Sequence, residues 1–106
     1  MSNLKESLDS LMELSGAKAA ALVDSASGMV IGQSGSKTNL DIAAAGNTEV
    51  IRAQLTLMES MGLNDAIDDI LITLTTQYDI LRQLQEHPSM FIYLTMDKSK
   101  SNLALA

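Results

Sequence analysis

Residues 39–62, with the sequence NLDIAAAGNTEVIRAQLTLMESMG, decide how this chain folds. They predict one long helix, with Thr38 or Asn39 available to cap its first turn. On a helical wheel at ~100° per residue, one stripe of apolar side chains is wide enough to lie on a β-sheet. That stripe consists of Leu40, Ala44, Ile51, Leu55 and Met58. The segment therefore predicts a helix that covers one face of a sheet.

A second apolar stripe lies beside the first. The two stripes span an arc of roughly 200°, about double what a surface helix needs. The second stripe comprises Ala43, Gly46, Val50, Ala53, Leu57 and Met61, with Asn47 and Gln54 at its border. The rest of the helix is polar, apart from Ile42, and includes Asp41, Thr48, Glu49, Arg52 and Thr56.

Three kinds of partner are considered for the second stripe: another helix of the same chain, a small ligand, or a second copy of the chain. The small residues Ala43, Gly46 and Ala53 allow another backbone to come close. A two-fold dimer places the same patch against itself, so one stripe is sufficient. We favour the dimer, and the other two remain open on the sequence alone.

The segments around this helix predict an α+β sandwich in a single domain, residues 1–106. A short helix is expected over residues 3–15, and a further helix is expected to begin at Asp97. Apolar runs predict strands at Lys18–Val23, Met29–Gln33, Ile70–Thr76, Tyr78–Leu84 and Met90–Met96. The last run is apolar on both faces, which predicts a central strand.

The strand expected at Ile70–Thr76 has a sequence suited to pairing with its own copy. It is rich in Leu, Ile and Thr, which favour strands. It contains no Pro, Lys or other residue that would block pairing at a sheet edge. If it lies at the edge, it supports the dimer.

Charge and composition exclude several classes of protein. The net charge is −6 and the seven basic residues are scattered, which argues against binding to nucleic acid or to an acidic membrane surface. The absence of cysteine excludes thiolate nucleophiles and zinc–thiolate sites. No signal peptide and no apolar run of ~20 residues is present, so we expect a cytoplasmic protein without membrane insertion.

No set of residues suggests catalysis, a cofactor or a metal. His87 is the only histidine and precedes Pro88, as expected of a turn. Asp65, Asp68 and Asp69 lack the spacing, glycine and terminal Glu of a calcium loop. The chain has no phosphate-binding loop of the P-loop GTPases. We therefore expect a protein that is not an enzyme.

At this level the chain resembles the Roadblock family, the dynein light-chain type with many bacterial members. The resemblance rests on the hairpin AAALVDSASGMVIG (residues 19–32), the Ala-rich long helix, and the ending MFIYLTMDKSKSNLALA (residues 90–106). It implies a profilin-like sandwich: a five-stranded antiparallel sheet with the long helix on one face and the N- and C-terminal helices on the other. The final helix is usually longer than NLALA, so we expect the N-terminal helix to leave apolar sheet uncovered.

The family also implies a homodimer in which the long helices lie side by side and the third strands pair edge to edge. Carried onto this chain, the contact involves Ala43, Gly46, Asn47, Val50, Ala53, Gln54, Leu57 and Met61 of the helix, with Leu71, Thr73 and Thr75 of the strand.

Family members bind and regulate Ras-like small GTPases or act as scaffolds, and bacterial relatives pair with a GTPase that controls polarity or surface motility. The polar side of the long helix, with Asp41, Glu49, Arg52 and Thr56, is the partner surface this resemblance favours. An ordinary solvated face is the competing interpretation. The alternatives to a GTPase regulator are a profilin- or PAS-like small-ligand sensor and a general dimerisation scaffold. A sensor needs convergent polar groups in a pocket, and the strands predict no such set.

Overall fold

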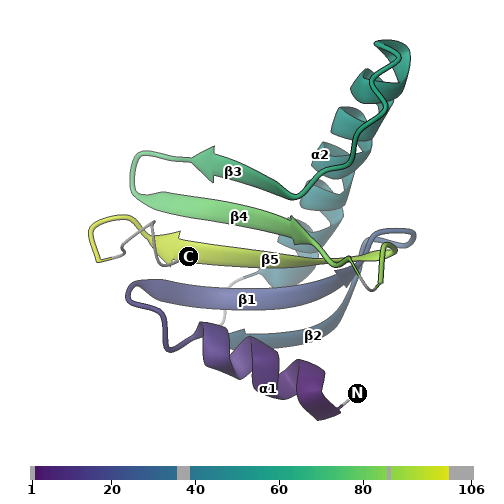
Figure 1. Cartoon of the computed structure of the whole chain (residues 1–106). Coiled ribbons are helices and arrows are strands. Elements are labelled where there is room, and N and C mark those ends of the chain that lie inside the picture. The colour runs from purple at the N-terminus through teal and green to yellow at the C-terminus, as the bar shows by residue number, and fades with distance from the viewer. Residues whose placement is uncertain (1, 36–38, 86, 101–106) are drawn as a thin grey trace.

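The computed structural model describes residues 2–35, 39–85 and 87–100, with side chains from Lys5 onward. Its elements are α1 (Ser2–Leu11), β1 (Ala17–Asp24), β2 (Met29–Gly35), α2 (Leu40–Ser60), β3 (Asp69–Thr73), β4 (Gln77–Gln83) and β5 (Met90–Asp97). The strands form one antiparallel sheet in the order β2-β1-β5-β4-β3 (Figure 1). The α+β architecture and the central place of the last strand are thus confirmed.

The helices differ in two ways from the expectation. The first helix ends at Leu11, because the next residues form tighter turns, with Leu14 N–H bonded to Leu11 O at 3.1 Å and Gly16 at φ 86°. The expected C-terminal helix falls largely on residues 101–106, outside the described part. Up to Lys100 the chain forms a turn after β5, in which Asp97 accepts hydrogen bonds from the Ser99 amide and hydroxyl.

The first stripe of α2 packs on the sheet largely as predicted. Leu40, Ala44, Ile51 and Met58 are buried, and three of them join a core with residues of β1, β4 and β5. Leu55 is an exception, with 46% of its surface exposed. Thr48, placed on the polar side, is instead buried, and its hydroxyl donates to Ala44 O at 2.7 Å.

The reason for the Thr48 difference is the β1–β2 loop. This loop lies on α2, where a Cβ on Gly28 would come within 3.6 Å of the Thr48 hydroxyl. Polar side chains that meet such a loop are buried although they lie outside the apolar stripe. Leu55 lies between the buried residues Ile51 and Met58 of the same helix and is nevertheless 46% exposed.

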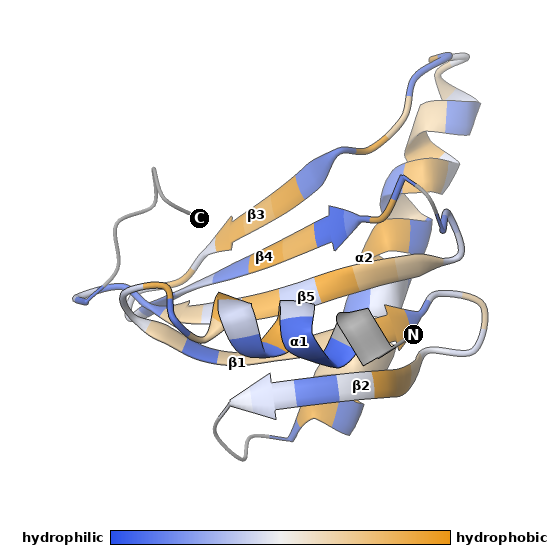
Figure 2. Ribbon diagram, turned by 60° about the horizontal axis from the view of Figure 1, so that its bottom comes forward, coloured by the Kyte–Doolittle hydropathy of each residue, from blue (hydrophilic) through white to orange (hydrophobic). Residues whose placement is uncertain are grey.

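The opposite face of the sheet is only half covered. Leu8 of α1 packs with alternate residues of β1 and with Leu94 and Met96 of β5. Because residues 19–21 are all alanine, and all fully buried, helices approach β1 closely from both sides. Figure 2 shows α1 over β1 and β2 and not over β3 or β4. No helix in the described residues is long and apolar enough to cross a membrane.

Phe91 provides a test of this core, because its side chain is fully buried in the layer between α2 and the sheet. We expect Phe91→Ala to lower the free energy of unfolding by about 3–5 kcal/mol, measured by urea denaturation at one protein concentration. Met29→Ala is the control: Met29 is 68% exposed, so its loss should be below about 0.5 kcal/mol. Equal losses for the two variants would contradict this core.

Candidate self-association surface

Most of the second stripe of α2 is exposed. Val50, Leu57 and Met61 have 37%, 51% and 68% of their surfaces exposed. Gly46, Ala53 and the border residue Gln54 are also exposed, whereas Ala43 in the stripe and Asn47 at its border are half buried. The other described helix, α1, lies on the opposite face of the sheet, so it does not cover this stripe. Within the described chain, the interpretation of the stripe as internal core is therefore wrong.

Strand β3 lies at the edge of the sheet, the position in which its sequence suits pairing with a second copy. Two hydrogen bonds show which residues of β3 direct their backbone groups toward β4. They run from Leu74 N–H to Gln77 O at 2.8 Å and from Gln83 N–H to Asp68 O at 3.4 Å. In an antiparallel ladder the backbone groups of alternate residues point to opposite sides. The even-numbered residues of β3 therefore face β4, and Asp69, Leu71 and Thr73 direct their N–H and C=O groups away from the sheet.

Of the three contact residues predicted on this strand, two lie on β3 and one lies outside it. Leu71, 47% exposed, and the exposed Thr73 lie on β3 with their backbone groups outward. Thr75 lies in the bend between β3 and β4, not in the strand, because the strand ends at Thr73. The placement of Thr75 on the pairing edge was thus wrong.

The two edges of the sheet are protected to different degrees. At the β2 edge the pairing with β1 is interrupted by a bulge at Leu22/Val23, and Lys5 of α1 donates to Gln33 O at 2.9 Å. Bulges and lysines are devices that prevent edge pairing. Strand β3 pairs with β4 without a register shift and contains no lysine. This contrast favours β3 as the edge open to another chain.

A depression joins the two halves of this surface. It has a volume of about 540 Å³ and lies between the C-terminal half of α2 and the start of β3. Its walls include Gln54 and Met58 of α2, Leu63 and Ile67 of the connection, and Ile70 of β3. Gln54 at the border of the helix stripe and Asp69 at the start of the strand edge thus line one concave region.

One ion pair lies beside the exposed edge of β3. Arg82 on β4 binds Asp69 with both ends of its guanidinium, at 2.6 and 3.2 Å. These hydrogen bonds raise the pKa of Arg82 further above its usual range, against the opposing effect of partial burial. Both side chains are about half exposed, so the pair contributes little stability. Its effect is to neutralise the carboxylate at the start of β3.

The predicted partner residues Asp41, Glu49, Arg52 and Thr56 are all exposed on α2. Arg52, however, is engaged within the chain. It pairs with Glu49 at 2.9 Å and donates to the carbonyl oxygens of Ser25 and Ala26 at 3.1 and 2.8 Å. The Arg52 side chain therefore links the β1–β2 loop to the helix. No sequence pattern indicated this role, because backbone carbonyl groups have no sequence signature.

That loop is held from other sides as well. Asp24 accepts from the Ala26 amide and the Ser27 hydroxyl, while Ser25 bonds through its amide and hydroxyl to Ser89 O in the β4–β5 loop. The β1–β2 loop is thus hydrogen-bonded both to the β4–β5 loop and to the middle of α2, and it lies beside the polar face of that helix. Whether these residues contact another protein stays a prediction.

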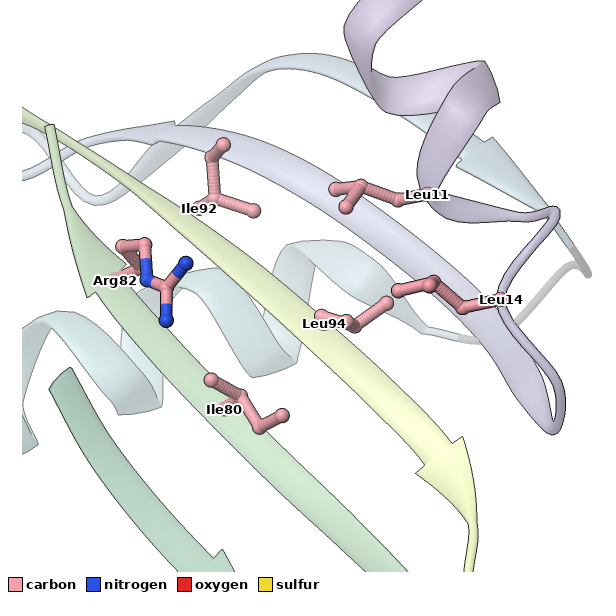
Figure 3. A pocket seen from close by; sticks show the side chains of 6 residues that line it. All are labelled: Leu11, Leu14, Ile80, Arg82, Ile92 and Leu94. Carbon is pink, nitrogen blue, oxygen red and sulfur yellow. The ribbon is translucent and has the colours of Figure 1, made fainter. Parts of the chain in front are cut away.

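A hollow on the half-covered face bears on the ligand-sensor alternative. Figure 3 shows it between the end of α1 and the sheet, lined by Leu11, Leu14, Ile80, Arg82, Ile92 and Leu94. Its volume is about 110 Å³, well below the roughly 300–1,000 Å³ of typical ligand sites. Its one charged group, Arg82, already binds Asp69. This geometry gives little support to a small-ligand site.

The strands do hold one polar cluster, contrary to the sequence expectation. The Gln77 amide donates to Asp79 at 2.8 Å and to the Thr95 hydroxyl at 3.0 Å, and the Tyr93 hydroxyl lies 3.5 Å from Asp79. Burial, followed by the charge of Asp79, raises the pKa of Tyr93. The residues come from two adjacent strands, so their meeting depends on register. They satisfy one another and line none of the hollows described above. Nor do the described residues bring three or more His, Asp or Glu side chains together as a metal site.

Comparison with protein-family models and with curated proteins gives no match in sequence. Solved structures do match. MglB of Myxococcus xanthus superposes with a TM-score of 0.84 at 18% identity, covering 99% of this chain and 83% of that one. A Roadblock/LC7 domain from Streptomyces avermitilis gives a TM-score of 0.78 at 12% identity, covering 99% of this chain and 83% of that one.

The chain has the Roadblock fold. A gliding protein MglB from Thermus thermophilus agrees, with a TM-score of 0.79 at 18% identity over 93% of this chain and 73% of that one. At such identities the likeness shows the fold alone. It confirms the resemblance seen in the hairpin, the long helix and the last strand.

Leu57 tests the stripe directly. We expect Leu57→Asp to weaken self-association at least about tenfold, because burying an unpaired carboxylate in an apolar contact costs more than ~1.4 kcal/mol. Thr56→Asp is the matched control, since it places the same charge one residue earlier on the polar face. The measurement is the dissociation constant from sedimentation equilibrium. Equal effects of the two substitutions would mean that the stripe is not the contact.

Proposed function

We propose that this protein is a non-enzymatic homodimer that binds a Ras-like small GTPase and regulates it or acts as its scaffold. The observation that carries the proposal is the exposed apolar stripe of α2 next to the unprotected edge of β3. Monomeric proteins rarely expose large contiguous apolar patches. A two-fold dimer covers both features at once, because each copy offers the same helix stripe and the same strand edge.

The partner follows from the fold and from the resemblance, which the Roadblock-type structures support. The MglB of Thermus thermophilus is described as a gliding protein, in keeping with a GTPase that acts in motility or polarity. In the proposed dimer the polar faces of both α2 helices stay outside the contact. Each face presents Asp41, Glu49 and Thr56, next to the β1–β2 loop whose carbonyl oxygens Arg52 binds.

The mode of action is ordering of the GTPase's own catalytic groups. The sequence contains two arginines, Arg52 and Arg82. Both are engaged within the chain, with Glu49 and loop carbonyls and with Asp69 respectively. An arginine supplied in trans must instead reach the transferred phosphate. Substituting either arginine is therefore expected to alter binding more than any rate of hydrolysis in the complex.

The test is capture from a lysate of the source organism with the immobilised protein, in the presence of a non-hydrolysable GTP analogue or of GDP. We expect one Ras-like GTPase to be enriched in one nucleotide state, identified by mass spectrometry. Thr56→Asp, which should stay dimeric, is expected to reduce this capture. Failure to retain any GTPase in either state would contradict the proposal and leave a general dimerisation scaffold.

A further inference from the structure

The β3 edge contains enough information to define how two copies align. We propose that two β3 strands pair antiparallel about a two-fold axis at Leu71, so that Leu71 faces Leu71 of the second copy and Asp69 faces Thr73. The inference rests on the proposed dimer and adds its register, which the fold does not specify.

The backbone groups of alternate β3 residues point away from the sheet. The bonds from Leu74 to Gln77 and from Gln83 to Asp68 fix Asp69, Leu71 and Thr73 as the outward-facing residues. Two antiparallel copies gain ladder hydrogen bonds only where outward residues oppose one another. Centring the pair on Leu71 aligns all three residues, giving about six ladder bonds. Moving the axis to Ile70 or Ile72 aligns two residues and gives about four.

The position of the axis also decides which side chains of the two strands face each other. With the axis at Leu71, two leucines face each other on the α1 side of the sheet, and Ile70 faces Ile72 on the α2 side. Apolar cross-strand pairs of this kind stabilise a sheet. With the axis at Ile70, Asp69 faces Leu71 and Asp68 faces Ile72, which sets carboxylates against apolar side chains. An axis at Asp69 places two carboxylates opposite each other, a destabilising pair.

The β3 edge is regular over the whole segment that pairs. β3 and β4 pair residue by residue from Asp69–Arg82 to Thr73–Tyr78 without a bulge. Beyond Thr73 the chain bends into the turn to β4, so Thr75 cannot extend the ladder. A pair centred on Leu71 therefore uses the whole of this short regular segment.

The absence of cysteine from the chain makes the test direct. Three variants each carry one cysteine, at Leu71→Cys, Ile70→Cys or Ile72→Cys, and disulfide formation under mild oxidation is followed by non-reducing electrophoresis. Opposed residues in an antiparallel pair have Cα atoms ~4.5–5.5 Å apart, within the range of a disulfide, whereas Cα atoms beyond ~7 Å cannot be bridged.

We expect Leu71→Cys to cross-link with itself at least about ten times faster than Ile70→Cys or Ile72→Cys alone, because only residue 71 lies on the axis. A mixture of Ile70→Cys and Ile72→Cys should cross-link between the two variants. Self-cross-linking of Ile70→Cys or Ile72→Cys would place the axis there and overturn the register.

Sedimentation of the same proteins tests the dimer separately from the register of β3. A dimer in which none of these positions cross-links would overturn the β3 register and leave self-association intact. A monomeric wild-type protein would overturn both the register and the proposed dimer.

Discussion

Three residues at the edge of the sheet, Asp69, Leu71 and Thr73, direct backbone N–H and C=O groups away from the described chain. An exposed edge strand is a template for pairing with any other strand, and proteins usually protect it. Here the opposite edge carries a bulge and a lysine that caps a carbonyl, while β3 carries neither. The exposed stripe of α2 lies on the same side of the molecule as this open edge, bordering one depression with it. The account of self-association depends on this asymmetry between two edges of one sheet.

The two sides of α2 then have separate roles. The first stripe, apart from Leu55, forms the core with β1, β4 and β5, whereas most of the second is exposed, as the proposed dimer requires. The polar side contacts the β1–β2 loop through Arg52 and Thr48, so the loop is fixed before any partner arrives. A surface whose loops are already ordered loses less conformational entropy on binding. This arrangement is suited to a regulator that presents a rigid face to a second protein.

Periodicity explains which parts of the structure were predictable. The apolar positions of α2 repeat with the helical period, and most of those assigned to the sheet are buried. The central place of β5 followed from its apolar run, and the suitability of β3 for edge pairing followed from the absence of protecting residues. The errors came from contacts with segments distant in sequence. Thr48 is buried by a loop, and the polar cluster around Asp79 forms only when β4 and β5 are in register. Arg52 likewise binds carbonyl oxygens, which no residue type in the sequence marks.

The most direct test of the central claim is the mass of the wild-type protein in solution across a wide concentration range, by sedimentation equilibrium. The account predicts a reversible dimer of twice the 11.3 kDa chain at micromolar concentrations. It also predicts dissociation to the single chain on dilution, with no larger open-ended assembly, because a two-fold contact closes on itself. A protein that remains a monomer at micromolar and higher concentrations would contradict the account.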